Sequence, residues 1–301
     1  MSVLPYYDPY MIGSGVPIQA VPYQQGIATP ITNVGPAQNG APQFAGIQYV
    51  FVEDPLLELD SCTGVIIRQQ PEIFEAIMGC ETANRYHVFG ITPQGHKYLF
   101  KCRERSEVCG RICCPAEMRE FNMEIYHAVS SGLLNNLKTF AEGFKPLKCP
   151  CCCLNRPVMT VKTNQQYVGK IVHLFSCMDP EFEVFDANGT LKYSVHADCC
   201  QCGIACSKNI CGKFSNALFE VYDGRTHNLV ANINKMSAQS FSEVVTDADS
   251  YTVTFPQNAS AFDKLLLITL GLMIDYQYFE TNANDNNSGI YGGGYRRRYY
   301  Y

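Results

Sequence analysis

A chain of 301 residues with 47% hydrophobic and 17% charged side chains is long enough to bury one substantial core. Its formal charge of -5 lacks the surplus of lysine and arginine with which nucleic-acid binders neutralise phosphates, so we expect no nucleic-acid partner. The first residues lack a basic segment followed by an apolar one, and we therefore expect a cytosolic chain whose 16 cysteines are reduced. No window contains 18 or more apolar residues, so the sequence predicts no conventional membrane span.

Residues 1–52 are expected to form a flexible arm. Asp8 is their only charged residue, and Pro, Gly, Gln and Tyr recur, so large apolar side chains are too few to build a core. The arm could offer contacts to protein partners. Residues 281–301, rich in Asn, Gly, Tyr and Arg, are expected to be a second disordered tail. The folded domain is therefore assigned to residues 53–280.

This domain is predicted to be mainly β. Residues 85–91, 97–101, 157–162 and 169–175 mix β-branched and aromatic side chains with partial alternation. Asn188-Gly189 and Asp223-Gly224 each separate two strand patterns, and such dipeptides suit the positive φ of tight β-hairpin turns. Strands this numerous predict a sandwich or a barrel.

One segment departs from the strand pattern, because its middle is apolar on every side. We expect a buried hydrophobic helix over residues 262–279. Its uninterrupted apolar run, residues 265–274, would rise only about 15 Å as a helix, about half of a bilayer's hydrocarbon layer, so it cannot cross a membrane alone. The apolar side chains expected to be buried are Leu265, Leu266, Leu267, Ile268, Leu270, Leu272, Met273 and Ile274.

Motifs of enzymatic catalysis are missing from the sequence. It contains no phosphate-binding GxxxxGK[ST], no GxSxG nucleophile turn and no HExxH zinc motif, and its six histidines are scattered. We therefore expect no catalytic residues and no covalent chemistry.

The segment KCPCCCLNR contains the first informative cysteine group, Cys149, Cys151, Cys152 and Cys153. Adjacent thiols in a loop suit palmitoylation, because two or more acyl chains are needed for stable membrane anchoring. Lys148 and Arg156 beside them would favour anionic lipid headgroups. Zinc binding and buried structural thiols are the alternatives, and zinc is disfavoured because no second cysteine pair follows at the usual spacing.

Two further cysteine groups are less easily interpreted. Packed free thiols are the simplest interpretation, and zinc binding is a minority alternative for either group. The second group comprises Cys199, Cys200, Cys202, Cys206 and Cys211, and the third comprises Cys109, Cys113 and Cys114.

Residues 247–258, DADSYTVTFPQN, have some features of a calcium loop. Asp247 and Asp249 could offer carboxylate oxygens, but Thr252 and Asn258 stand where an EF-hand needs Gly and Glu, so only a weak site is expected. A polar turn leading into a strand is the alternative. Read as a strand, the segment puts five side chains on one face: Asp247, Asp249, Tyr251, Val253 and Phe255. Only the two aspartates would then bind calcium, and the other three would pack inward.

Taken in order, the Pro-rich arm, LLELDSCTGVIIRQQPEIFEAIMGCETANRY, the CPCCC run, VTDADSYTVTFP and LLLITLGLMIDYQYFE resemble the phospholipid scramblase family over about residues 54–280. The resemblance implies a tubby-like fold, a closed antiparallel β-barrel of about 12 strands around a C-terminal hydrophobic helix, with residues 265–278 as its plug. A rival view treats that helix as a membrane span. Asp275 would be costly in hydrocarbon, and translocating Arg296, Arg297 and Arg298 would oppose the positive-inside tendency.

The same resemblance implies calcium-stimulated, ATP-independent movement of phospholipids in both directions between leaflets, including exposure of phosphatidylserine. Its calcium ligands match Asp247, Asp249, Tyr251, Val253, Phe255 and Asn258, and Asn258 replaces the aspartate of the family pattern. The family's nuclear-import segment matches residues near 230–240, where Lys235 is the only basic residue, so a nuclear role is not supported.

The expected setting is the cytoplasmic face of a membrane containing anionic lipids, with the plasma membrane preferred and a mitochondrial membrane as the alternative. Acylated cysteines would hold the barrel on the inner leaflet, and calcium at Asp247 and Asp249 would reduce repulsion and favour docking or self-association. Two rival functions are a tubby-like lipid-binding adaptor without transport activity and a zinc-dependent structural protein.

Overall fold

The structure, a computed structural model, describes residues 29–31, 48–50, 54–70, 84–106, 119–128, 139–148, 155–176, 179–201, 204, 216–236 and 250–279. The chain divides into two compact units, Met1–Val52 and Glu53–Tyr301. In the first unit β1 (Thr29–Ile31) pairs with β2 (Gln48–Val50) in an antiparallel sheet. The composition of residues 1–52 did not predict these two strands.

The second unit is a closed antiparallel barrel, as the sequence resemblance implied. Strands β3 to β14 follow one another around the ring in chain order, and β14 pairs with β3 to close it. The strands are β3 (Gly64–Gln69), β4 (Arg85–Thr92), β5 (Gly95–Arg105), β6 (Phe121–His127), β7 (Thr139–Lys145), β8 (Val158–Thr163), β9 (Tyr167–His173), β10 (Glu181–Asp186), β11 (Leu191–His196), β12 (Ala217–Asp223), β13 (Leu229–Met236) and β14 (Ser250–Thr254).

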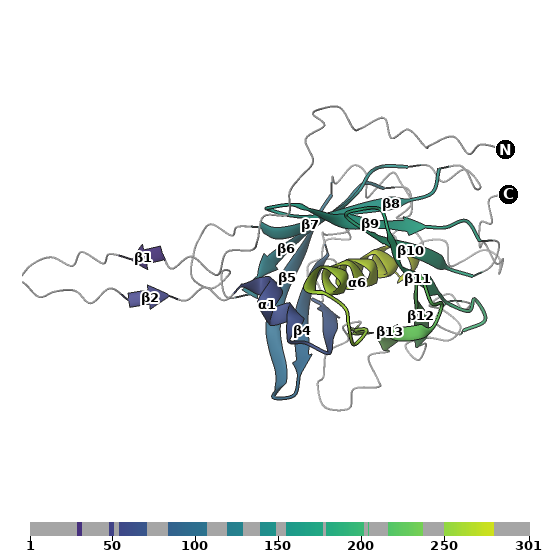
Figure 1. Cartoon of the computed structure of the whole chain (residues 1–301). Coiled ribbons are helices and arrows are strands. Elements are labelled where there is room, and N and C mark those ends of the chain that lie inside the picture. Colours follow the sequence, from purple (N-terminus) through teal and green to yellow (C-terminus); the bar gives the residue numbers. More distant parts are fainter. Residues whose placement is uncertain are drawn as a thin grey trace, which may run out of the picture. The chain divides into compact units, whose positions relative to one another are not determined.

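The barrel encloses the predicted hydrophobic helix, α6 (Ala261–Ile274), around which the strands labelled β4 to β13 form a ring (Figure 1). All of residues 265–274 are buried. A helix that is apolar on every side must be covered on every side, and a closed sheet provides that cover. The helix continues as a π-helical turn, η3 (Asp275–Phe279), so helical structure extends as far as predicted but changes geometry at Asp275. Among the described residues, no helix is long and apolar enough to cross a bilayer.

Two strand glycines make room for the helix. A Cβ on Gly143 would lie 2.8 Å from the Thr269 side chain, and one on Gly169 would lie 3.2 Å from the Leu266 side chain. At Gly169 the added carbon would also meet the carbonyl oxygen of Phe185 on the neighbouring strand at 2.1 Å. The absence of a side chain therefore sets how closely strand and helix approach.

A short helix, α1 (Pro55–Asp60), precedes the barrel and packs against the start of α6. Lys264 Nζ donates to the carbonyl oxygens of Asp60 and Cys62 at 2.6 and 3.1 Å. These carbonyls lie at the C-terminal end of α1, where unpaired carbonyls and the helix dipole favour a cation.

Both predicted hairpins are present, but their turns differ. Gly189 has a φ of 78°, as the Asn-Gly signal predicted. In the second hairpin the residue with positive φ is His227, at 56°, and not Gly224. The Asp223 carboxylate instead accepts hydrogen bonds from the backbone N–H groups of Arg225 and Thr226 at 3.0 and 2.7 Å. The turn is consequently longer than the two-residue turn that the dipeptide indicated.

Candidate functional site

The barrel topology places most of the sequence-predicted site residues in connections at one end. Neighbouring strands are antiparallel and consecutive, so every second connection opens at the same end. We call the end at which α6 ends and β14 begins the Asp275 end, and the end at which α6 begins the Ser260 end. The connections β5–β6, β7–β8, β11–β12 and β13–β14 all open at the Asp275 end.

These four connections contain all three cysteine groups and the two predicted calcium aspartates. Apart from Cys199 and Cys200, these residues lie outside the described part of the chain, but the strand ends that flank them are described. The connections are occupied as follows: Cys109, Cys113 and Cys114 in β5–β6; Cys149, Cys151, Cys152 and Cys153 in β7–β8; Cys199, Cys200, Cys202, Cys206 and Cys211 in β11–β12; Asp247 and Asp249 in β13–β14.

The Asp275 carboxylate is buried at this end, where α6 passes into η3. It is 4% exposed and accepts hydrogen bonds from the hydroxyls of Tyr86, at 2.5 Å, and Tyr251. Because a buried carboxylate is costly unless it is hydrogen-bonded, the two hydroxyls stabilise its position. They also connect the end of α6 to β4 and to β14. The sequence shows that Asp275 would be costly in hydrocarbon, but it does not reveal these two partners.

Three buried cations lie at the same end and were not singled out from the sequence. Lys145 donates a hydrogen bond to the carbonyl oxygen of Arg119, and both side chains are at most 1% exposed. Lys235, 6% exposed, places Nζ 3.9 Å from the centroid of the Phe279 ring. Cations are favoured near a helix C-terminus and over aromatic faces. A signal was available, because Lys145 and Lys235 continue the inward-facing alternation of their strands.

Exposed apolar side chains flank the connection that contains Cys149 to Cys153. Leu147, just after β7, is 61% exposed, and Phe175, just after β9, is 43% exposed. Lys148 and Arg156 stand at the two ends of the same connection. The combination of apolar and basic side chains suits a surface that meets lipid. Two other exposed leucines, Leu57 and Leu229, lie at the Ser260 end and provide a comparison.

His173 links Arg156 to the segment after α6. Its ring stacks on Phe182 with centroids 4.7 Å apart, and the Tyr278 hydroxyl lies 2.8 Å from its Nε2. The Arg156 guanidinium lies 3.2 Å from its Nδ1. Burial first, and then the positive charges of Arg156 and Lys145, lower the pKa of His173 to about 3. His173 is therefore neutral at physiological pH.

The four described residues of the set predicted for calcium do not converge. Tyr251, Val253 and Phe255 face the barrel interior, as the strand interpretation predicted, and Asn258 is exposed near the Ser260 end. The strand β14 from Ser250 to Thr254 spans about 14 Å, since a strand rises about 3.4 Å per residue. One ion therefore cannot bind residues from both ends of β14. The calcium hypothesis is left with Asp247 and Asp249, which lie outside the described residues.

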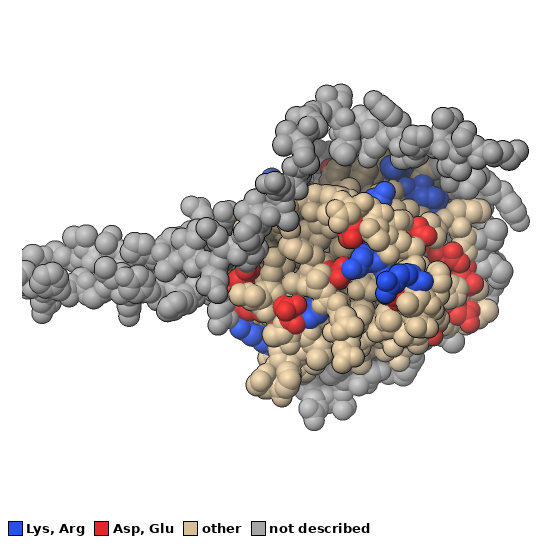
Figure 2. All heavy atoms as spheres, viewed as in Figure 1, with Lys and Arg blue, Asp and Glu red and all other residues tan. Residues whose placement is uncertain are grey.

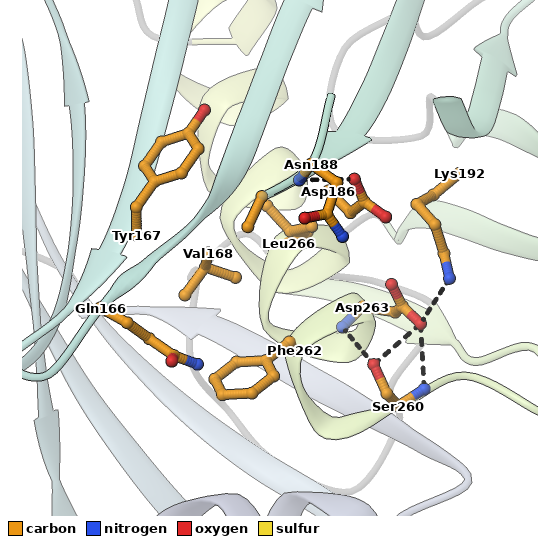
Figure 3. A pocket seen from close by; sticks show the side chains of 11 residues that line it. Gln166, Tyr167, Val168, Asp186, Asn188, Lys192, Ser260, Phe262, Asp263 and Leu266 are labelled. Carbon is orange, nitrogen blue, oxygen red and sulfur yellow. Dashed lines mark hydrogen bonds and ion pairs between the residues drawn. The ribbon is translucent and has the colours of Figure 1, made fainter. Parts of the chain in front are cut away.

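A hollow of about 210 Å³ lies at the Ser260 end, between α6 and the β8–β9 and β10–β11 turns (Figure 3). Ser260 and Asp263 form a reciprocal capping box at the start of α6. Lys192 Nζ lies 3.2 Å from the Asp263 carboxylate. The helix N-terminus is thus already occupied by a carboxylate of the chain, which argues against an anion site in the hollow. On the face shown in Figure 2, acidic and basic side chains are intermixed and separated by uncharged surface.

A family model described as Scramblase matches residues 47–281. Phospholipid scramblase 1 of Rattus norvegicus is 25% identical over 232 residues, which cover 75% of this chain and 63% of the rat protein. Phospholipid scramblase 2 of Homo sapiens is 23% identical over 252 residues, covering 81% of this chain and 79% of that protein. Phospholipid scramblase family member 5 of Homo sapiens is 22% identical over 219 residues, covering 72% and 73%.

The chain thus spans less than two thirds of the length of the rat protein. No solved structure matches it.

Proposed function

This chain belongs to the scramblase family, and we propose that it moves phospholipids in both directions between the leaflets of a membrane, without ATP and under stimulation by calcium. Exposure of phosphatidylserine would be one consequence. The observation that supports this proposal best is the topology, which assigns the cysteine run and the two aspartates to connections at the end that also has exposed Leu147 and Phe175.

Docking is the first step of the proposed mechanism. Acyl chains on Cys149, Cys151, Cys152 and Cys153 would anchor the Asp275 end to the cytoplasmic leaflet, since two or more chains give stable attachment. Insertion of Leu147 and Phe175 would add apolar burial. Lys148 and Arg156 would attract anionic headgroups, an interaction of about 1 kcal/mol per cation near the surface.

Calcium acts in this mechanism through charge. Asp247 and Asp249 would otherwise repel an anionic leaflet from the connection that precedes β14. A calcium ion held by their carboxylates removes that repulsion and can bridge to lipid phosphates. Calcium would therefore increase membrane docking at the same end that carries the acyl chains.

The lipid path lies outside the barrel in this proposal. The interior is filled by α6, whose residues 265–274 are buried, and the side chains of the surrounding strands pack against it. The barrier to headgroup movement is a hydrocarbon layer of about 30 Å. Protein held against one leaflet can lower that barrier by local thinning of the bilayer.

A lipid-binding adaptor is the second candidate, and the filled interior also favours it. Recognition of headgroups by the Asp275 end requires no route for lipid through the protein. The two candidates differ in one measurable property, because only a scramblase accelerates lipid exchange between leaflets.

The deciding experiment uses full-length protein from a eukaryotic host, so that its cysteines can be acylated, reconstituted in vesicles with fluorescent phospholipid. Dithionite reduces only outer-leaflet probe, so scrambling removes the protected inner fraction. We expect calcium to accelerate this loss for wild-type protein and not for Asp247→Ala/Asp249→Ala. The control Asp60→Ala/Glu183→Ala removes two carboxylates that lie outside the four connections and should behave as wild type.

Vesicle flotation is measured on the same samples. Binding to vesicles with the protected fraction unchanged in every condition would reject transport and support the adaptor. An equal calcium response in both double variants would reject the proposed calcium site.

A further inference from the structure

Asp198, Cys199 and Cys200 lie just after β11 at the Asp275 end. In the described ranges they are the one group of three or more His, Cys, Asp or Glu residues whose candidate ligand atoms all lie within 4.8 Å of one another. Both thiols are free, and Cys199 is buried whereas Cys200 is exposed. We propose that these three residues bind one zinc ion, with water as the fourth ligand.

The distance between the two sulfur atoms fits this ion. Cys199 Sγ and Cys200 Sγ are 3.9 Å apart. Two thiolates bound to one tetrahedral zinc at about 2.3 Å each would be about 3.8 Å apart. A disulfide, in contrast, needs a separation of about 2.05 Å. The sulfur atoms therefore already stand at the spacing that a shared zinc ion requires.

The donor set selects zinc over calcium. Two thiolates and one carboxylate suit a borderline-soft cation, whereas calcium takes six to eight oxygen ligands. The Asp198 Oδ1 atom accepts a hydrogen bond from the Cys200 backbone N–H at 2.7 Å, so Oδ2 is the oxygen offered to a metal. This site is consequently distinct in chemistry from the one proposed at Asp247 and Asp249.

The backbone around the three residues is held from two sides. The Cys199 N–H donates to the Asp179 carboxylate at 2.9 Å, just before β10. The Gln201 side chain donates to the Leu218 carbonyl oxygen and accepts from the Leu218 N–H on β12, at 2.8 and 2.6 Å. A zinc ion here would stabilise the junction of β10, β11 and β12. Zinc binding at this site does not depend on lipid transport.

The test measures zinc per chain by mass spectrometry on full-length protein dialysed against dilute zinc. We expect Cys199→Ser/Cys200→Ser to bind one zinc fewer than wild type. The fourfold serine variant at Cys149, Cys151, Cys152 and Cys153 serves as control and should retain that zinc. Asp198→Asn should weaken binding at this site about tenfold or more and gives a milder second variant.

Cobalt substitution identifies the ligands directly, because tetrahedral cobalt(II) bound to thiolate has charge-transfer and visible bands. Cys199→Ser/Cys200→Ser should lack some of the bands that wild type shows. The fourfold serine variant should keep those same bands. Unchanged zinc content in both the double variant and Asp198→Asn would overturn the proposal. So would thioester-linked acyl chains on Cys199 or Cys200, detected by acyl exchange, because an acylated sulfur cannot bind metal as a thiolate.

Discussion

Replacing Tyr251 by phenylalanine tests whether the buried carboxylate of Asp275 stabilises the fold through its hydroxyl donors. The substitution removes one hydroxyl and leaves the ring, which lies 5.6 Å from Lys235 Nζ and packs near Phe279. Tyr251 is 1% exposed and Asp275 is 4% exposed, so solvent has little access to replace the lost donor. The Tyr86 hydroxyl remains as a donor at 2.5 Å.

The expected magnitude follows from the charge of the acceptor. A hydrogen bond to a charged group contributes about 1.5 to 3 kcal/mol, so Tyr251→Phe should lower the free energy of unfolding by about 2 kcal/mol. In an Asp275→Asn background the acceptor is neutral. The same tyrosine substitution should then cost about 1 kcal/mol, and the difference between the two costs is the coupling energy.

The assay is urea unfolding of the full chain followed by circular dichroism, because the sequence contains no tryptophan. Tyr167→Phe is the matched control, since Tyr167 is 44% exposed and its substitution should change stability by no more than about 0.5 kcal/mol. Equal unfolding free energies for Tyr251→Phe and this control would refute the reasoning.

Three further predictions concern pH, packing and docking. His173 is neutral in the folded state, whereas in the unfolded chain it protonates below a pKa of about 6.5, so the protein loses about 2 kcal/mol of stability between pH 7.5 and pH 5. Unfolding curves measured at a series of pH values should show a smaller loss for His173→Gln. Gly169→Ala should lower the free energy of unfolding by about 2 kcal/mol or more, because its Cβ would meet the Phe185 carbonyl oxygen; no change in the urea midpoint would contradict this. Leu147→Ser/Phe175→Ser should weaken vesicle binding, measured by flotation, about tenfold or more. The control Leu57→Ser/Leu229→Ser, at the Ser260 end, should bind vesicles as wild type does.

The sequence predicted the local elements well because their signals are local. The apolar run of residues 265–274 admits only a fully covered helix, and Asn188-Gly189 gives a hairpin turn wherever it stands between strand patterns. The second hairpin was predicted for an incorrect reason, since its turn depends on the side chain of Asp223.

Local sequence patterns could not predict that the sheet closes into a barrel. It depends on the pairing of β14 with β3, whose residues are distant in sequence, and patterning alone left sandwich and barrel equally open. From the sequence alone, Gly143 and Gly169 would be interpreted as residues that destabilise a strand, although in the structure they leave room for α6. The residue pattern could have identified Lys145 as inward-facing, but not the Arg119 carbonyl to which it donates.

The structure also constrains how calcium could act. Tyr251 follows Asp249 by two residues, and β14 is hydrogen-bonded to β13 and β3 on its two sides and to Asp275 through that tyrosine. A strand held in this way cannot shift without breaking buried interactions. We infer that calcium at Asp247 and Asp249 would change the surface charge of the Asp275 end and leave α6 in place. Tyr251→Phe should accordingly lower stability while preserving the acceleration of lipid exchange that we propose for calcium.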